Sequence, residues 1–220
     1  MMSDRYTSPE FDAAALITID TQRDVLDGAP LEIAGTSAAL PAMARLAQAF
    51  RAAGRPIVHI VRIYEADASN VDACRRGAVR DGARILLADE PGTELAGELL
   101  PDGAPALDTP TLLAGGVQSL GGEEVAIYKP RWGAFFGTPL QAHLRAGGVS
   151  TLVFCGCNFP NCPRASIYEA SERDYRVVLA RDATSGLYER GERELAAIGV
   201  ALMDTAELER SIQAANTLLT

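Results

Sequence analysis

The chain has 220 residues, of which 48% are hydrophobic, and its formal net charge at pH 7 is −9. This length and hydrophobic content are enough for one domain with a sizeable core, and the acidic charge disfavours nucleic acid or an anionic membrane as main partner. No apolar run approaches the roughly 20 residues needed to cross a bilayer, and the N-terminus lacks the features of a signal peptide. We therefore expect a single cytoplasmic domain over residues 1–220.

The first part of the chain is typical of a strand, a helix and a second strand. An apolar run from Ala13 to Ile19 ends in Asp20, and a second run, PIVHIVRI, covers residues 56–63. Between them, residues 37–53 place apolar side chains at helical spacing until Gly54. Two apolar strands joined through a helix predict a parallel sheet with helices on both faces, which is a three-layer α/β/α sandwich.

Periodicity weakens over residues 64–118, where glycine, proline and charged residues are frequent. Only a short apolar run at 84–87 and a helical turn at 93–100 are indicated there. Because structureless segments of this length inside compact domains are often functional, we expect a long excursion near the functional site.

Order returns with a strand at 124–128, which ends before Lys129 and Pro130, and a helix at 138–146. The remaining predicted elements alternate: a strand at 152–154, a helix at 163–173, a strand at 175–180, a helix at 189–198, a strand at 200–203 and a helix at 206–218.

Cys162 follows a tight turn and stands at the predicted start of a helix. Pro163 suits the first helical position, where its missing N–H would have had no partner. A thiol at a helix N-terminus is close to free backbone N–H groups and to the positive end of the helix dipole, which favour the thiolate. Cys162 is therefore a candidate nucleophile, although burial as a small apolar residue is the usual fate of cysteine.

Ligands of parallel α/β sheets lie beyond the carboxyl ends of the strands. That edge should gather Asp20, Arg62 or Tyr64, Lys129 and the turn that carries Cys162. A carboxylate can take the thiol proton and an ammonium can hold both groups in their charged forms, so the set predicts a Cys-Asp-Lys site. The alternatives are a turn or helix cap for Asp20 and a solvated charge for Lys129.

Three blocks, ITIDTQRD, YKPRWGAFFGTPL and FCGCNFPNCPRASIYEASERDYRVVLARDAT, resemble the isochorismatase-like cysteine hydrolase superfamily, which includes nicotinamidases and N-carbamoylsarcosine amidohydrolases. The resemblance covers about residues 13–205, with the blocks in the family's order. It implies Asp20, Lys129 and Cys162 as the catalytic triad and a six-stranded parallel sheet. It also implies hydrolysis of a small amide through a thioester and a homo-oligomer, a dimer or larger.

The resemblance further implies a cis peptide bond between Cys157 and Asn158. Such a turn would direct the backbone N–H groups of Asn158 and Cys162 at one point, forming an oxyanion hole. Phe159 and Pro160 stand where the family usually has a Thr-Asn or Thr-Asp pair, so the turn departs from the family pattern.

A metal ion of the kind that the family's nicotinamidases bind is not expected. Those enzymes carry an Asp-x-His pair after the second strand, where this chain has Arg62-Ile63-Tyr64, and a guanidinium cannot ligate a cation. We interpret His59 as a sheet histidine and His143 as a helix-surface residue, and we expect no cofactor. Four cysteines are too few for a secreted disulfide framework; Cys155, Cys157 and Cys162 could bind zinc only if Cys74 joined them.

The expected substrate pocket takes aromatic and polar side chains. Trp132, Phe135 and Phe136 resemble the family's aromatic substrate-facing segment, although ordinary packing is a strong alternative for at least one of them. Gln22, Arg62 and Tyr64 could add polar contacts, and Arg62 would suit a substrate carboxylate.

The sequence thus predicts a metal-independent cysteine hydrolase that cleaves a C–N bond of a small amide or carbamoyl compound. One alternative with the same fold is a vinyl-ether hydrolase in which Asp20 acts as the acid. Others are a redox or zinc-binding protein that uses the cysteine cluster, and a catalytically silent scaffold.

Overall fold

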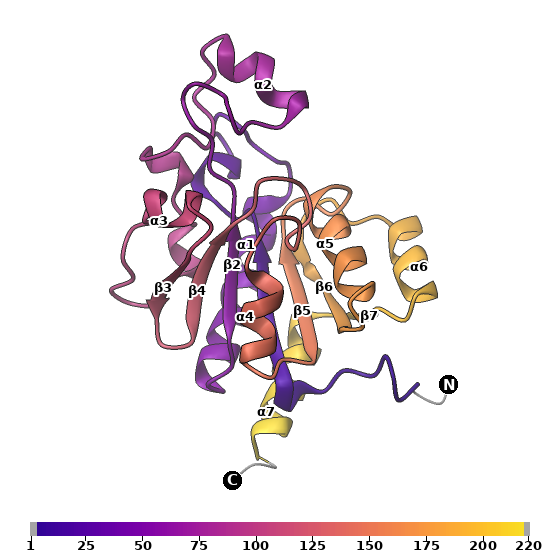
Figure 1. The fold of residues 1–220 in the computed structure, drawn as a ribbon. Helices are drawn as coiled ribbons and strands as arrows, with labels where there is room; N and C mark the ends of the chain where they lie inside the picture. The colour runs from indigo at the N-terminus through magenta and orange to yellow at the C-terminus, as the bar shows by residue number, and fades with distance from the viewer. Residues whose placement is uncertain (1–3, 218–220) are drawn as a thin grey trace.

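The computed structural model describes residues 4–217 and has the predicted three-layer α/β/α architecture, with a sheet between two layers of helices (Figure 1). The strand order is β3-β4-β2-β1-β5-β6-β7. The strands are β1 (Ala14–Ile19), β2 (Ile57–Val61), β3 (Val117–Gly121), β4 (Glu124–Tyr128), β5 (Thr151–Gly156), β6 (Arg176–Thr184) and β7 (Ala201–Met203).

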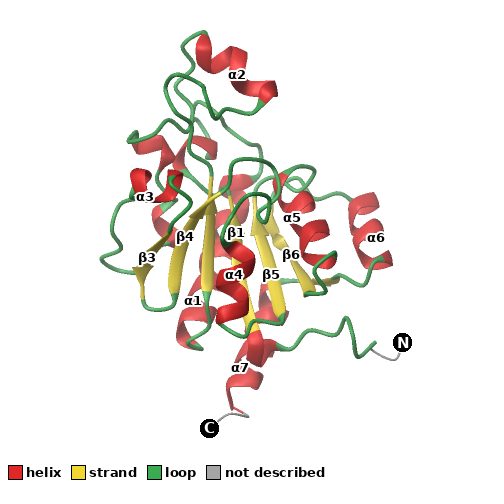
Figure 2. Cartoon of the chain, in the orientation of Figure 1, coloured by secondary structure: helices red, strands yellow, loops and turns green. Residues whose placement is uncertain are grey.

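Helices α1 and α7 cover one face of the sheet, and α4, α5 and α6 cover the other (Figures 1 and 2). The helices are α1 (Thr36–Ala52), α2 (Ala73–Arg80), α3 (Thr109–Leu113), α4 (Leu140–Ala146), α5 (Cys162–Ser171), α6 (Glu189–Ala197) and α7 (Thr205–Thr217). Short 3₁₀ turns occupy Phe11–Ala13, Arg23–Val25, Pro91–Thr93 and Gly97–Leu99.

Strand β1 shows why its sequence is almost entirely apolar. Leu16 packs on the α1 side of the sheet, whereas Ile17 and Ile19 pack on the side of α4 and α5. Successive side chains of a strand point to opposite faces, so a strand covered on both faces is apolar at nearly every position, and the polar side chain of Thr18 is hydrogen-bonded to His59. β1 pairs in parallel with β2 and with β5, which brings the carboxyl ends of these strands to one edge.

The six predicted strands are confirmed, and β3 is a seventh that the sequence reading missed. It pairs antiparallel with β4 at the edge of the sheet, and most of its residues are exposed or half-buried. An exposed edge strand has little apolar alternation, so it gives a weak pattern. Helices α2 and α3 were also missed, and the predicted turn at 93–100 consists of two 3₁₀ turns. Leu218, the predicted end of the last helix, lies outside the described residues.

The excursion after β2 projects beyond the carboxyl ends of the strands and carries α2 (Figure 1). It has an apolar cluster of its own, in which Tyr64, Val71 and Val79 meet the predicted run at 84–87. Among residues 4–217, no helix is long and apolar enough to cross a membrane.

Candidate active site

Asp20, Lys129 and Cys162 converge at the carboxyl edge of the sheet. Asp20 directly follows β1, Lys129 directly follows β4, and Cys162 begins α5. The Nζ atom of Lys129 lies 2.8 Å from Oδ2 of Asp20 and 3.3 Å from Sγ of Cys162. One ammonium group therefore contacts both the carboxylate and the thiol.

The backbone around Asp20 fixes the direction of its side chain. Its φ angle is 49°, in the left-handed region that aspartate tolerates better than most residues. Its N–H donates to Ile60 O at 2.9 Å, and its carbonyl accepts from the Cys157 thiol at 3.1 Å. Contacts from β2 and from the end of β5 thus hold Asp20 in this conformation.

Burial and charge set the protonation of the cluster. Asp20, Lys129 and Cys162 are 7%, 0% and 4% exposed. Burial by itself would raise the pKa of Asp20, but attraction to Lys129 and Arg62 outweighs it and lowers the pKa. Oδ1 of Asp20 is buried and has no hydrogen-bond partner among the described residues. Asp20 is therefore a charged carboxylate with one oxygen free to accept a proton.

The pKa of the Cys162 thiol is shifted in the opposite direction to that of Asp20. Burial and repulsion from Asp20 raise its pKa to about 11, although Lys129 and Arg62 act in the other direction. Burial thus opposes the stabilisation of the thiolate that we expected from the helix N-terminus. A neutral thiol beside an ionised carboxylate is an arrangement for proton transfer from sulfur to oxygen.

The turn before Cys162 differs from the prediction in its backbone. Residues 4–217 contain no cis peptide bond, so the expectation of a cis bond between Cys157 and Asn158 is wrong. The N–H of Cys157 donates to Ile19 O at 2.9 Å and that of Phe159 donates to Ser185 O at 2.8 Å, which ties the turn in its trans form to β1 and to the residue that follows β6. Phe159, one of the two residues that depart from the family pattern, is fully buried, and its packing helps to hold the turn.

The two predicted oxyanion donors have unoccupied N–H groups. The backbone N–H groups of Asn158 and of Cys162 have no hydrogen-bond acceptor within residues 4–217. The N–H of a first helical residue has no partner within its own helix, so the Cys162 N–H is free for a ligand. Their role as an oxyanion hole stays a prediction.

Arg62 lies beside the cluster and is held by protein groups. Its Nη1 forms an ion pair with Oδ2 of Asp72 at 2.6 Å, and its Nη2 donates to Arg131 O at 2.8 Å and to Sγ of Cys162 at 3.7 Å. Tyr64 joins the same group, because its hydroxyl donates to Asp72 at 2.7 Å. Both side chains point at protein partners here, so substrate contacts by Arg62 and Tyr64 stay predictions.

The sequence reading missed Asp72 and Arg75, which come from the excursion. Arg75 contacts the Tyr64 hydroxyl at 3.1 Å, and its guanidinium lies 5.3 Å from the ring centre of Trp132. On the chain these residues show no periodic or motif signal, since their contacts depend on how the excursion folds back.

The aromatic residues divide into different environments. The ring of Trp132 is half-buried, and the guanidinium groups of Arg62 and Arg75 lie 5.6 Å and 5.3 Å from its centre. Phe135 belongs to the apolar core and packs on Tyr175, so the ordinary packing alternative applies to it. Phe136 is exposed.

Gln22 is buried and its amide is occupied by the backbone. Its Nε2 donates to Arg62 O at 2.8 Å and to Thr93 O at 2.6 Å, while its Oε1 accepts from Arg62 N at 2.8 Å. These bonds link the ends of β1 and β2 to the excursion, and they disfavour the predicted substrate contact.

His59, Cys74 and Cys155 lie apart from the cluster, whereas the thiol of Cys157 contacts the backbone of Asp20. His59 is a buried sheet residue, as predicted, and contacts Thr18 and Glu124. Cys74 is exposed and Cys155 is buried on the α1 side of the sheet. Across residues 4–217, no group of three or more His, Cys, Asp or Glu side chains is placed to hold a metal ion.

A cavity of about 340 Å³ lies on the outer side of the first turn of α5. Its lining residues are Trp132, Pro160, Asn161, Arg164, Ala165 and Tyr168. The cavity therefore shares Trp132 with the surroundings of Arg62, and Asn161 precedes the candidate nucleophile.

Comparisons with known proteins give a consistent result. The model of the isochorismatase domain matches residues 14–207. A ureidoacrylate amidohydrolase, RutB, of Yersinia enterocolitica is 30% identical over 78% of this chain and 75% of its own length. A probable inactive nicotinamidase of Arabidopsis thaliana is 28% identical over 78% of this chain and 80% of its own length.

Solved structures agree with the fold. The crystal structure of an isochorismatase family protein from Desulfovibrio vulgaris superposes with a TM-score of 0.77 at 30% identity, covering 91% of this chain and 98% of that one. A cysteine hydrolase from Pseudomonas syringae superposes with a TM-score of 0.75 at 22% identity, covering 94% of this chain and 95% of that one.

Proposed function

The chain belongs to the isochorismatase family, and from that premise we propose that it is a cysteine hydrolase cleaving a C–N bond of a small amide or carbamoyl compound. The observation that carries the proposal is the position of Lys129 Nζ, 2.8 Å from the Asp20 carboxylate and 3.3 Å from the Cys162 sulfur. Amide-type substrates are those named for the amidohydrolase relatives.

In the first step Asp20 takes the proton of the Cys162 thiol, and the sulfur attacks the carbonyl carbon of the substrate. The carbonyl electrons move to the oxygen, where the free N–H groups of Asn158 and Cys162 would stabilise the negative charge. Lys129 contacts both partners of the proton transfer, so the charge moves between two sites that one cation stabilises.

In the second step the oxyanion collapses and the C–N bond breaks. The leaving nitrogen takes the proton from Asp20, ammonia or an amine departs, and a thioester to Cys162 remains. Asp20, again a carboxylate, then takes a proton from water, whose oxygen attacks the thioester. Return of that proton to sulfur releases the acid and restores the thiol, so protons balance over the cycle.

The direct test measures ammonia release from a panel of small amides, ureas, ureido acids and cyclic amides. Cys162→Ser serves as the blank, and Cys74→Ser, which changes an exposed cysteine, serves as the matched control. We expect turnover in the wild type and in the control but not in the blank, with an acyl adduct on Cys162 in a mass spectrum of quenched enzyme.

Two outcomes would decide against the proposal. Full turnover of a vinyl ether by Cys162→Ala would favour Asp20 acting alone as an acid. Absence of turnover across the panel, with Cys162 inert to iodoacetamide, would favour a silent scaffold. The proposal also includes a homo-oligomer, a dimer or larger, which light scattering of the purified protein tests.

A further inference from the structure

We propose that Arg62 is a further catalytic residue, a fixed guanidinium that stabilises the Cys162 sulfur as an anion together with Lys129. The inference rests on the proposed function, in which that sulfur is the nucleophile. It assigns to Arg62 an effect on the enzyme's own thiol, in place of the contact with a substrate carboxylate that the sequence suggested.

The guanidinium group of Arg62 lies close to the sulfur of Cys162. Nη2 of Arg62 lies 3.7 Å from Sγ of Cys162, while Lys129 Nζ lies 3.3 Å from the same atom. Arg62 directly follows β2, the neighbour of β1 in the sheet, and it is 1% exposed. Water screens a charge in this position little, so its effect on the sulfur is large for its distance.

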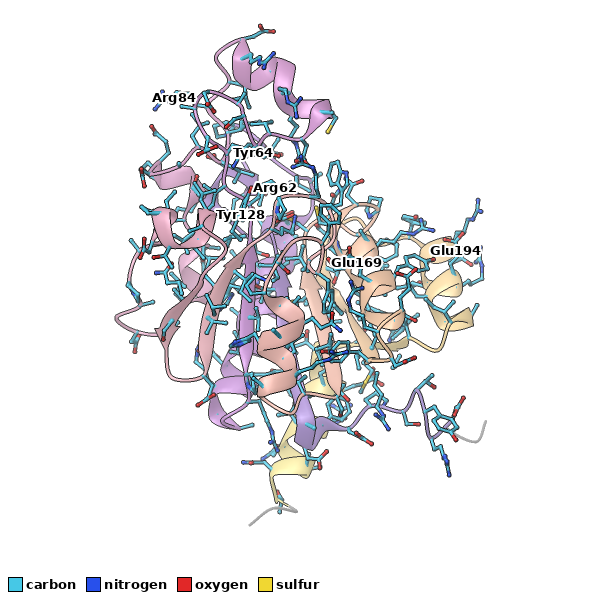
Figure 3. The ribbon with its side chains drawn as sticks, in the orientation of Figure 1. Arg62, Tyr64, Arg84, Tyr128, Glu169 and Glu194 are labelled. Carbon is cyan, nitrogen blue, oxygen red and sulfur yellow. The ribbon has the colours of Figure 1, made fainter. Side chains whose placement is uncertain are left out.

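Contacts with Asp72 and Arg131 hold the guanidinium group of Arg62 in this position. Nη1 is fixed by Asp72 at 2.6 Å, and Nη2 also donates to Arg131 O at 2.8 Å. The ring of Trp132 lies 5.6 Å from the guanidinium carbon. Figure 3 shows Arg62 with Tyr64 between the strand ends and the segment that carries α2. The guanidinium is thus oriented before any substrate arrives, which is the condition for electrostatic catalysis.

Asp72 is the positioning residue of this arrangement. It directly precedes α2, it is buried, and it also accepts a hydrogen bond from the Tyr64 hydroxyl at 2.7 Å. It pairs with Nη1 of Arg62, whereas Nη2 faces the sulfur. Asp72 therefore holds the guanidinium by one nitrogen and leaves the other directed at Cys162.

The proton transfer of the first step takes place among charged side chains. The charged groups that face Sγ are Asp20, Lys129 and Arg62, and the neutral thiol of Cys157 lies near them. When the proton passes from sulfur to Asp20, the negative charge moves onto sulfur. Attraction to Arg62 favours both the carboxylate and the thiolate, so it stabilises the charge before and after the transfer.

The test follows the alkylation of Cys162 by iodoacetamide as a function of pH, with exposed Cys74 as internal reference in peptide mass spectra. For Arg62→Gln we expect the profile to move to higher pH by about one to three pH units, the usual effect of losing an opposite charge at this distance. At a fixed pH below the midpoint, alkylation would be at least about tenfold slower. Arg62→Lys, which keeps a cation, should recover part of the rate.

Arg75→Gln is the matched control, because Arg75 joins the same Asp72 and Tyr64 network without contacting the sulfur. We expect it to keep the wild-type profile. If Arg62→Gln does not fold, the double variant Arg62→Gln/Asp72→Asn removes the buried ion pair as a unit and should show the same displacement.

A profile that stays within about twofold of the wild type in a folded Arg62 variant would overturn the inference. So would an equal drop in rate at every pH, which indicates lost access to the thiol rather than a changed thiolate population. The measurement uses no amide substrate, so its outcome is separate from the ammonia-release test of the proposed function.

Discussion

The side chains of Lys129 and Asp20 form a buried ion pair, with Nζ 2.8 Å from Oδ2. Each charge has lost most of its hydration, and the attraction between the two charges offsets part of that cost. The pair also joins the ends of two strands that are not adjacent, because β2 lies between β1 and β4 in the sheet. A change at either residue should therefore affect folding stability and catalysis together.

Lys129→Met should abolish turnover and destabilise the fold by about 3–5 kcal/mol, because it removes the ion-pair partner of the buried Asp20 charge. Urea unfolding measures the second effect. The double variant Lys129→Met/Asp20→Asn removes both charges, so it should be less destabilised than the sum of the single variants. Additive losses would show that the two side chains do not interact in solution.

Asp20→Asn keeps the shape of the side chain and removes the proton acceptor. We expect kcat/KM to fall by about 10² to 10⁴, the usual contribution of a general base. The fold should persist, and circular dichroism checks this. Activity within tenfold of the wild type would assign the proton transfer to another group.

The pH dependence of kcat/KM follows from the same two groups. The pKa of Asp20 is lowered, so the carboxylate stays ionised until the pH falls below its ordinary range of about 4. The pKa of the Cys162 thiol is raised to about 11, so the thiol keeps its proton over the neutral range. We expect a flat profile between about pH 6 and 9, and a limb near neutral pH would contradict this pairing of base and thiol.

Ligands of a parallel sheet lie beyond the carboxyl ends of its strands, and this rule was enough to predict that Asp20, Lys129 and Cys162 lie close together. Each of them follows an apolar run, and the carboxyl ends of parallel strands lie at one edge of the sheet whatever conformation the loops adopt. The partners of Arg62 are different. Asp72 lies ten residues after Arg62 in the excursion, whose sequence shows no periodicity. Only the folded excursion therefore reveals the contact between the two side chains.

The turn before Cys162 shows a second limit of sequence reasoning. The family resemblance implied a cis peptide bond after Cys157. The hydrogen bonds that hold the backbone of this turn come from β1 and from Ser185 after β6. These partners are distant in sequence. Position within a motif therefore predicted where the candidate nucleophile lies and not the geometry of its turn.

His59 should make folding stability depend on pH. Burial lowers its pKa from the ordinary value near 6.5, although the hydrogen bond to Glu124 acts in the other direction. As the pH falls through about 6.5, the unfolded chain binds a proton at this residue and the folded chain does not. The free energy of unfolding should then decrease, by up to about 1.4 kcal/mol per pH unit, until the lower folded pKa is reached.

Urea unfolding between about pH 5 and 7 measures this slope. This pH interval lies above the range in which carboxylates such as Glu124 ordinarily titrate. His59→Gln should flatten the slope. The matched control is His143→Gln, since His143 is the other histidine of the chain and lies half-buried on α4. An unchanged slope in His59→Gln would show that His59 takes up its proton in the folded state as well.

Gly156→Ala should both destabilise the fold and impair the site, because the chain passes very close to β1 at this point. The φ angle of Gly156 is 115°, and a Cβ would lie 2.2 Å from the carbonyl oxygen of Ile19. Backbone atoms must shift to relieve such a contact, and the turn to Cys162 begins here. We expect a loss of about 2–4 kcal/mol in urea unfolding and a lower kcat.

Gly77→Ala is the matched control: Gly77 lies within α2 with open space at its Cβ, so alanine there should raise stability by about 0.5–1 kcal/mol. Equal effects of the two substitutions would show that the close approach to Ile19 does not constrain the turn.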